Sequence, residues 1–485
     1  MTLTKAASAV LSLALVAGAA PQTEIVSLGA GGQGNFPSNA PASVSNDGRY
    51  VAFASFASNL VAGDTNNRAD VFLRDGVLGT TVRVSTGPGG VEGDADSSTP
   101  SMSADGRYIA FQSLATNLAP LDFNGRSDVF LYDRATSTLS LVSRSSFGSF
   151  GNAASAKPVV SADGRFVAFE SLASNLVTGD TNNASDIFMS STTALGAGPT
   201  RVSVDSSGSQ GGASSFNAAL SATGRFVVWD SNALNFEMPD LNNVNDVFMR
   251  DLQTGQTIRV SKDASGFPGF DTSLAGSVSA DGRFVSFTSF ANNLVPGDSN
   301  LSADIFVKDT QTGAIERVSV GPAGVQGNFG STGSRISADG RFVAFQSDAV
   351  NLVAGDTNGK SDIFVRDRQS GVTERADVST AGAQSNNSAR SASLSADGRY
   401  LTFETIADNL VAGDSNTFID VFLRTRALCA ADLDADAAVN TADLALLLSS
   451  FGRPVAPGTS GDYNSDGVVN TLDLAYFLTD FGCSN

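Results

Sequence analysis

The stretch Ser161-Ala162-Asp163-Gly164-Arg165-Phe166-Val167-Ala168-Phe169 decides the fold of this chain, because close copies of it recur along most of the sequence. Its Asp-Gly-Arg core begins at Asp47, Asp105, Asp163, Asp281, Asp339 and Asp397, and Thr223 replaces the aspartate in the one remaining copy. Successive copies lie 58 residues apart, except for one interval of 60. A fixed period of this length indicates a repeat architecture, here of seven units.

Each unit has the pattern of four short antiparallel strands. In the first unit, residues 42–45 are extended, residues 46–49 have the composition of a hairpin turn, and residues 50–54 alternate as a strand does. A long polar loop then leads to a third strand at residues 70–74 and a fourth at residues 81–85. Seven such units predict an all-β fold, a seven-bladed β-propeller over residues 23–426.

The two ends of the repeat region predict how the ring closes. The last unit ends after its third strand, at residues 420–424, and an extra strand precedes the first unit at residues 24–27. We therefore expect the N-terminal strand to complete the last blade, which leaves no open sheet edge.

These units resemble the WD40-like repeats of TolB-type propellers, often called PD40. The resemblance rests on residues 161–169 and their copies. It implies the propeller fold and leaves the function open, because that family includes scaffolds, binding proteins and a few enzymes.

The composition excludes several classes of function. The formal net charge is −19, which disfavours nucleic acid and anionic membrane surfaces as partners. The sequence has no histidine, so Ser-His-Asp triads and histidine-ligated metals are excluded. Residues 1–20 have the pattern of a secretory signal peptide, with Lys5, an apolar run at residues 6–17 and Ala17-Gly18-Ala19. The alternative is an N-terminal membrane anchor, for which the run is short. No later segment is apolar enough to span a bilayer, so we expect a secreted protein.

Every unit also carries an Asp-x-Asn-x-x-x-Asp loop. The copies are Asp64/Asn66/Asp70, Asp122/Asn124/Asp128, Asp180/Asn182/Asp186, Asp240/Asn242/Asp246, Asp298/Asn300/Asp304, Asp356/Asn358/Asp362 and Asp414/Asn416/Asp420. Such oxygen side chains could hold Ca²⁺, or they could fix the loop through Asx-turns and caps. Their presence in every blade favours the structural interpretation. We expect Arg49 and its copies to pair with one of these carboxylates, such as Asp70.

Strand alternation predicts which loops share a face. The Asp-Gly-Arg turns lie on one face of the ring, here called the turn face. The long Asp-x-Asn loops and the Gly-rich connections lie on the other, the long-loop face, where we expect a propeller ligand to bind.

The C-terminal segment, residues 430–485, contains two loops with oxygen ligands at positions 1, 3, 5, 7, 9 and 12, the EF-hand arrangement for Ca²⁺. The first set is Asp432, Asp434, Asp436, Ala438, Asn440 and Asp443, and the second is Asp462, Asn464, Asp466, Val468, Asn470 and Asp473. Ala438 and Val468 would contribute backbone carbonyls. An apolar helical pattern follows each loop, at residues 444–448 and 474–478.

This pair of loops resembles a type I dockerin, a small all-α module with two F-hand calcium loops, in which position 12 is Asp. The ending Phe481-Gly482-Cys483 resembles the GC-type variant. The resemblance implies two Ca²⁺ ions, a cohesin-like protein partner and a Cys429–Cys483 disulfide. It places Thr441, Ala442, Thr471 and Leu472 at partner-binding positions. Ala437 stands where the sharp turn of the first loop prefers glycine, so the first site is expected to bind Ca²⁺ more weakly.

These features lead to two hypotheses of function. The first is a secreted, non-catalytic protein whose propeller binds a protein or polysaccharide and whose dockerin anchors it to a cohesin-bearing partner or cell surface. The second is a polysaccharide-active hydrolase or lyase with a carboxylate pair outside the sevenfold pattern. Five acids on the loop face lie outside the sevenfold pattern, namely Glu92, Asp94, Asp96, Glu237 and Asp271. Nothing in the sequence selects a pair among them, so no catalytic residue is assigned. A TolB-like translocation component is disfavoured by the C-terminal segment.

Overall fold

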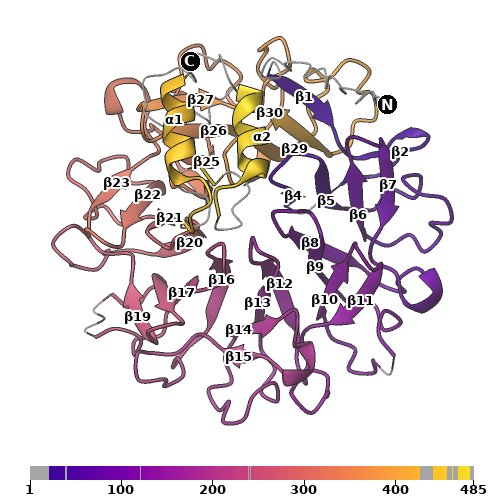
Figure 1. Cartoon of the computed structure of the whole chain (residues 1–485). Coiled ribbons are helices and arrows are strands. Elements are labelled where there is room, and N and C mark those ends of the chain that lie inside the picture. The colour runs from indigo at the N-terminus through magenta and orange to yellow at the C-terminus, as the bar shows by residue number, and fades with distance from the viewer. Residues whose placement is uncertain are drawn as a thin grey trace, which may run out of the picture.

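Seven four-stranded antiparallel sheets are arranged as blades around a common centre, as the sequence predicts (Figure 1). The computed structural model describes residues 21–38, 41–120, 122–238, 240, 242–426, 441–455, 461–462 and 468–480. The first strand of each blade lies nearest the centre of the ring, and the fourth lies at its rim.

The strands of the first four blades follow the chain in order. Blade 1 contains β4 (Ser43–Val44), β5 (Tyr50–Ser55), β6 (Asp70–Asp75) and β7 (Thr80–Arg83). Blade 2 contains β8 (Ser97–Met102), β9 (Tyr108–Ser113), β10 (Asp128–Asp133) and β11 (Thr138–Leu141). Blade 3 contains β12 (Ser155–Val160), β13 (Phe166–Ser171), β14 (Asp186–Ser191) and β15 (Thr200–Arg201). Blade 4 contains β16 (Ser215–Leu220), β17 (Phe226–Ser231), β18 (Asp246–Asp251) and β19 (Gln256–Arg259).

The remaining blades repeat this order until the chain returns to its start. Blade 5 contains β20 (Ser273–Val278), β21 (Phe284–Ser289), β22 (Asp304–Asp309) and β23 (Ile315–Arg317). Blade 6 contains β24 (Ser331–Ile336), β25 (Phe342–Ser347), β26 (Asp362–Asp367) and β27 (Val372–Arg375). Blade 7 contains β28 (Ala389–Leu394), β29 (Tyr400–Thr405) and β30 (Asp420–Thr425), and its fourth strand is β1 (Gln22–Ile25). A small hairpin, β2 (Leu28–Gly29) and β3 (Gly32–Gln33), follows β1.

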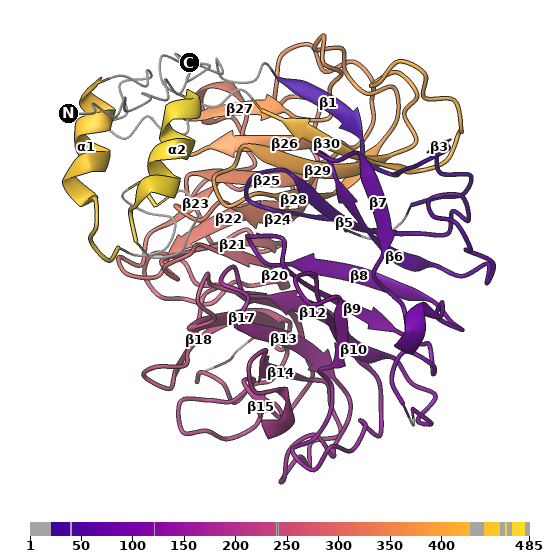
Figure 2. The ribbon, with the colours of Figure 1, turned by 45° about the vertical axis from the view of Figure 1, so that its right-hand side comes forward.

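The N-terminal strand closes the ring, which confirms the predicted arrangement. β1 runs antiparallel to β30, with Glu24 opposite Leu423 and Ile25 opposite Phe422. The indigo N-terminal strand lies beside the orange strands of blade 7 in both views (Figures 1 and 2). Ile25 and Val26 are buried, so the closing strand contributes apolar contacts as well as backbone pairing.

The Asp-Gly-Arg turn is held by short polar contacts and by its glycine. In blade 1 the Ser45 hydroxyl donates to Asp47 Oδ1 at 2.6 Å, and the backbone N–H of Arg49 donates to the same oxygen at 3.0 Å. Gly48 has φ +70°, and a Cβ there would lie 2.4 Å from the ring of Tyr400 in blade 7. Glycine is therefore required both for the turn and for the close approach of the neighbouring blade.

Stacked aromatic rings fill each blade at the repeated phenylalanine positions. Phe53 and Phe72 stack at 5.8 Å between ring centroids, and both are fully buried. Equivalent pairs occupy the other six blades, with Trp229 replacing the first phenylalanine in blade 4. The regular Phe spacing in the sequence thus marks the blade cores.

The expected partner of Arg49 is wrong. Arg49 binds Asp75 and not Asp70, with Nη2 to Oδ2 at 2.8 Å. The strand register gives the reason, because Asp75 lies opposite Tyr50 on the turn face whereas Asp70 lies opposite Ser55 at the other end of the strand pair. The same pair forms in four further blades, between Arg107 and Asp133, Arg225 and Asp251, Arg283 and Asp309, and Arg341 and Asp367.

Two helices of ten residues follow the propeller, α1 (Thr441–Ser450) and α2 (Thr471–Asp480). They lie side by side in both views (Figures 1 and 2), and Leu447, Val469 and Phe477 form a small buried cluster. The backbone N–H of Gly452 donates to the carbonyl of Val469 at 2.7 Å, which ties the end of α1 to the segment before α2. Within the described ranges, no helix has the length and apolar character needed to cross a membrane.

Deletion of residues 21–30 should destabilise the whole propeller. The deletion exposes the edge of β30 and removes two buried apolar side chains, Ile25 and Val26, a change of about 3–6 kcal/mol in the free energy of unfolding. Denaturant unfolding followed through Trp229, the single tryptophan, measures this loss in the propeller itself. Unfolding of the truncated protein at the same denaturant concentration as the mature chain would show that β1 does not close the ring.

Candidate functional site

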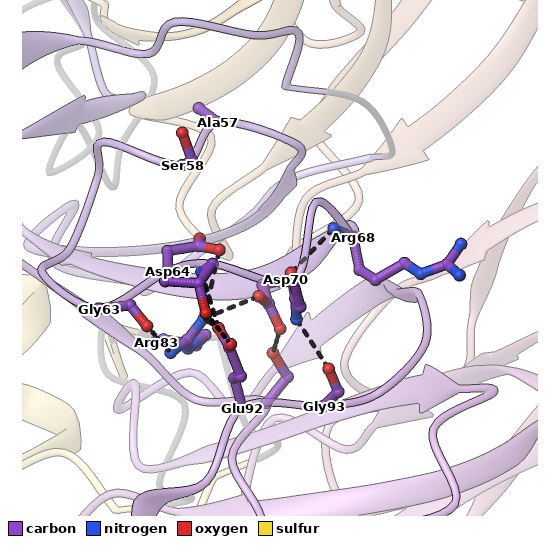
Figure 3. A network of polar contacts seen from close by, with 12 residues as sticks. Ala57, Ser58, Gly63, Asp64, Arg68, Asp70, Arg83, Glu92 and Gly93 are labelled. Atoms are coloured by element: carbon purple, nitrogen blue, oxygen red, sulfur yellow. Dashed lines mark hydrogen bonds and ion pairs between the residues drawn. The ribbon is translucent and has the colours of Figure 1, made fainter.

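The Asp-x-Asn loops are held by buried ion pairs and hydrogen bonds within the chain. In blade 1, Asp70 is fully buried; its Oδ1 accepts from the Ser85 hydroxyl at 2.6 Å and its Oδ2 accepts from Arg83 at 3.0 Å (Figure 3). Arg83 also pairs with Asp64 at 3.5 Å and Glu92 at 3.1 Å. We call Asp70, Arg83 and Ser85, with their copies, the loop network.

The loop network recurs around the ring, which supports the structural interpretation of the motif. An arginine joins the two loop aspartates in five blades, and these arginines are Arg83, Arg201, Arg259, Arg317 and Arg375. Leu141 and Ile25 occupy that strand position in blades 2 and 7. Burial raises the pKa of Asp128 and of Asp420 in those blades to about 6.

The five off-pattern acids named above are engaged in local structure. Glu92 accepts from Thr65, Asp94 from Thr116, Asp96 from the N–H of Ala69, Glu237 from Arg259 and Lys262, and Asp271 from the N–H of Thr272. These contacts tie each acid to a loop segment or a strand end of its own or the neighbouring unit.

One position on the second strand of each blade, the strand that pairs with the inner strand, carries different side chains in different blades. This position lies seven residues after the start of each Asp-Gly-Arg turn and is here called the inner-wall position. The seven residues are Ala54, Gln112, Glu170, Asp230, Thr288, Gln346 and Glu404. Their variety contrasts with the strand-3 aspartate of the loop network, which is identical in all seven blades.

Blades 3 and 4 bring charged and amide groups together at this position. The Lys157 ammonium lies 3.3 Å from Glu170 Oε1 and donates to Asn217 Oδ1 at 3.1 Å. Asn217 Nδ2 in turn donates to Asp230 Oδ1 at 2.8 Å. Lys157 is half exposed, so this chain of contacts begins at the solvent and ends at a buried carboxylate. We call Lys157, Glu170, Asn217 and Asp230 the inner-wall cluster.

Part of this cluster supports a backbone irregularity. The inner strands of blades 2 to 7 contain a register shift, and Lys157 and Asn217 have φ of +48° and +54° at those shifts. The freed N–H of Asn217 donates to Glu170 Oε2 at 3.3 Å, and that of Ala275 donates to Asp230 Oδ1 at 3.1 Å. The acids therefore join neighbouring blades while Lys157 stays accessible.

Burial changes the acidity of two inner-wall carboxyls. Desolvation raises the pKa of Asp230 to about 6, against hydrogen bonds from Asn217 and Ala275 that lower it. Desolvation also raises the pKa of Glu404 to about 7, although Arg390, 3.2 Å away and half exposed, acts in the opposite direction. Both groups therefore titrate close to neutrality.

An apolar ring surrounds this wall on the long-loop face. The residue two places beyond the inner-wall position is Phe56, Leu114, Leu172, Phe290 or Ile406 in five blades, each between 39% and 54% exposed. Asn232 and Asp348 interrupt the ring in blades 4 and 6. We call these seven residues the rim. A hollow of about 290 Å³ adjoins Phe290 and is also lined by Gln346 and Asp348.

A larger hollow, about 720 Å³, lies at the outer strands of blade 2. Its described lining includes Leu139, Leu141 and Leu195, and Arg144 is the one charged residue among the lining residues that the structure describes. It offers apolar packing without a second charged group, so the rim and inner wall are the better candidate for specific recognition.

Sequence reasoning missed the inner-wall position because it searched for acids that depart from the repeat on loops. Glu170 and Asp230 lie within regular strands, inside the most repetitive part of each unit. The signal was available by aligning the seven units on their Asp-Gly-Arg turns, where this position runs through Ala, Gln, Glu, Asp and Thr while the preceding residue is Phe or Trp and the following one is Ser or Thr.

The predicted calcium ligands are described in part. Asp443 and Asp473 are fully buried in the first turns of α1 and α2, Asp462 is buried, and Asp473 Oδ2 accepts from the N–H of Asn470 at 2.8 Å. Thr441, Ala442 and Thr471 are exposed, and Leu472 lies in α2 without a described side chain. The remaining predicted residues lie outside the described residues: Cys429, Asp432, Asp434, Asp436, Ala438, Asn440, Asn464, Asp466 and Cys483.

The described ligands suit a hard cation. No group of three acidic or cysteine side chains is placed to hold a metal among the residues that the structure describes, and four of the seven carboxylates in the two sets lie outside them. Asp473 is nevertheless buried with one oxygen already hydrogen-bonded, and a carboxylate has further lone pairs for a cation. Carboxylate and carbonyl oxygens are the donors that Ca²⁺ takes.

Comparison with known proteins finds similarity only among solved structures. No protein-family model matches the chain, and no curated protein matches it. TolB from Agrobacterium tumefaciens is 14% identical, with 72% of this chain and 95% of that chain covered and a TM-score of 0.39. Oligogalacturonate lyase from Vibrio parahaemolyticus is 11% identical (84% and 97% covered, TM-score 0.49). The β-propeller domain of the Trilobed protease from Pyrococcus furiosus is also 11% identical (80% and 95% covered, TM-score 0.49). The propeller assignment stands on the blade topology of this chain.

Replacement of Arg83 by Met should destabilise the propeller strongly, because it leaves Asp64 and Asp70 buried without their cation. We expect a loss of about 3–5 kcal/mol in the free energy of unfolding. Arg49→Met in the same blade is the matched control and should cost clearly less, since the Arg49–Asp75 pair is partly exposed. Equal losses in the two variants, measured by denaturant unfolding, would contradict the structural role of the loop network.

Proposed function

We propose that this protein is a secreted binding protein whose propeller recognises a protein segment at the rim and inner wall of the long-loop face. The observation that carries the proposal is the concentration of asymmetry there. The loop network and the turns repeat around the ring, whereas the inner-wall position and the rim differ from blade to blade. Recognition of one ligand by a symmetric ring requires such differences.

The chemistry of this surface favours a protein over a polysaccharide as ligand. The rim mixes Phe, Leu and Ile, which form the apolar anchors of protein interfaces, whereas sugar recognition relies on flat aromatic platforms. Lys157 and Arg390 are both half exposed inside the rim and can pair with carboxylates of a bound segment. Lys157 already pairs with Glu170 and Arg390 with Glu404, so a carboxylate of the ligand would compete with these two acids.

We further propose that residues 430–485 form a dockerin that binds two Ca²⁺ ions and attaches the protein to a cohesin-like partner or cell surface. Two complete ligand sets, two helices of equal length and the buried position-12 aspartates support this. The exposed Thr441, Ala442 and Thr471 are available to a partner.

A polysaccharide-active enzyme is the second candidate. The pKa values of Asp230 and Glu404, raised to about 6 and about 7, lie in the range of general acids. Three donors hold Asp230, including Asn245 at 3.1 Å, which favours a positioning role over a catalytic one.

Replacement of Leu114 and Leu172 by Ser should weaken ligand binding, because it removes two of the five apolar rim residues. The matched control is Val77→Ser with Leu78→Ser, two exposed apolar residues on the turn face. The mature protein is first screened against secreted-protein libraries and glycan arrays. Binding of each ligand found is then measured for the mature protein, the rim variant and the control variant. We expect binding at least about tenfold weaker in the rim variant alone. Ligands bound equally well by the rim variant would refute the proposed surface. Polysaccharide turnover lost in Glu404→Gln would favour the enzyme.

The mature protein should take up two Ca²⁺ ions, measured by titration calorimetry. Asp443→Ala and Asp473→Ala should each remove one site, because each takes away the closing ligand. Asp473→Asn keeps an acceptor for the Asn470 N–H and removes the charge, which separates metal binding from helix capping. Asp271→Ala, an exposed propeller acid, is the control. Calcium uptake that is absent, or is unchanged by the position-12 substitutions, would exclude the dockerin.

A further inference from the structure

Blade 6 departs from the loop network at one buried position. Six blades carry a serine that donates to the strand-3 aspartate: Ser85 to Asp70, Ser143 to Asp128, Ser203 to Asp186, Ser261 to Asp246, Ser319 to Asp304 and Ser27 to Asp420, all between 2.5 and 2.7 Å. In blade 6 the same place is taken by Asp377, opposite Asp362.

Asp377 accepts the same backbone hydrogen bond that the serine accepts in the other blades. In the other blades the serine oxygen accepts the N–H of the residue after the aspartate, as Ser319 does from Ile305 at 3.1 Å. Asp377 Oδ1 accepts the N–H of Ile363 at 3.0 Å in the same way. The serine hydroxyl also donates a hydrogen bond to the strand-3 aspartate, and an ionised carboxylate has no hydrogen with which to do so.

The carboxyls of Asp362 and Asp377 lie next to each other, and the positive charge near them is too small to balance two carboxylates. Asp362 and Asp377 are both fully buried, and within the part of the chain that the structure describes, Asp362 Oδ2 and Asp377 Oδ2 receive no hydrogen bond. Arg375 is the one cation of this network, 3.0 Å from Asp356 and 3.5 Å from Asp362. Three buried aspartates therefore share a single positive charge.

We propose that blade 6 contains a proton-binding site, in which one proton shared by Asp377 and Asp362 replaces the serine hydrogen of the other blades and makes the propeller sensitive to pH. The proton forms an O–H···O⁻ bond between the two carboxyls and removes one buried negative charge. Two adjacent buried carboxylates cannot both ionise at ordinary cost.

Burial and the neighbouring carboxyl favour the protonated form of Asp377, whereas the backbone N–H of Ile363 favours its ionised form. Burial and the neighbouring Asp362 raise the pKa of Asp377 well above its usual value. Asp362 lies on β26, Arg375 on β27 and Asp356 in the preceding loop, where Arg375 pairs with both aspartates. The native state therefore holds a proton that the unfolded chain releases above about pH 4.

The sign of the pH dependence follows from this proton. Because the native state binds one proton more than the unfolded state, the stability contributed by the pair is complete below about pH 4 and is lost as the pH rises through the native pKa. Other buried acids also titrate in the propeller, so the test compares variants and does not rely on the wild-type curve alone.

The test measures unfolding of the full mature protein by denaturant at pH 4 to 9, in excess EDTA, through Trp229 in blade 4. Asp377→Ser restores the residue of the other blades, and Asp377→Asn keeps the size and supplies an N–H donor without a titrating proton. The wild-type unfolding constant should rise relative to both variants by about tenfold per pH unit until the native pKa is reached. Ser319→Asp in blade 5 is the reciprocal variant and should acquire the same pH dependence.

The outcome against the proposal is equally specific. If the wild type, Asp377→Ser and Asp377→Asn keep a constant ratio of unfolding constants from pH 4 to 9, the pair holds no extra proton. This measurement involves neither ligand binding nor calcium, so its result is independent of the proposed function. Asp377→Ser restores the residue that the other six blades carry at this position, so we expect this variant to fold.

Discussion

Closure of the ring between β30 and β1 is the constraint on which the rest of the molecule depends. A blade has no complete core of its own, since Ala52, Ala54 and Leu73 of blade 1 share one buried cluster with Ile109 and Phe111 of blade 2. Each blade is therefore stabilised by its two neighbours. Without the N-terminal strand, blade 7 would expose the edge of β30, and the last seam of the ring would lose Val26 against Val421 and Leu423.

Closure also determines where function can reside. The turns and the loop network must be nearly identical in all blades, because they set the geometry of each seam and each long loop. Inter-blade contacts such as Gly48 against the ring of Tyr400 leave little freedom on the turn face. The inner-wall position and the rim are less constrained, since Ala54 and Glu170 fill the same place in different blades. Variation there changes the ligand surface without changing the ring.

The sequence was sufficient for the fold and insufficient for the inner wall, for physical reasons. A fixed period, a glycine turn and alternating strands specify local hairpins, and those hairpins specify the blades. The partner of Arg49 depended on strand register, which places Asp75 and not Asp70 beside the turn. The inner-wall cluster joins Lys157 to Asn217 across two blades, and a contact between residues 60 positions apart leaves no local pattern. Most of the C-terminal calcium ligands lie outside the described residues, so that part of the sequence prediction stays a proposal.

The seven blades also act as natural variants of one another, which shows how a propeller balances buried charge. In five blades one arginine pairs with both loop aspartates, and one of these, blade 6, adds a third acid in Asp377. Blades 2 and 7 replace the arginine by Leu141 and Ile25 and keep both acids. A buried carboxylate without a cation remains in place only if it is protonated or well supplied with donors. Burial raises the pKa of Asp128 and Asp420 to about 6, and it raises the pKa of Asp246 to about 6 as well, although Arg259 pairs with that aspartate. Desolvation therefore acts on the strand-3 aspartate in blades with and without an arginine, and blade 6 differs because Asp377 adds a second buried carboxyl beside it.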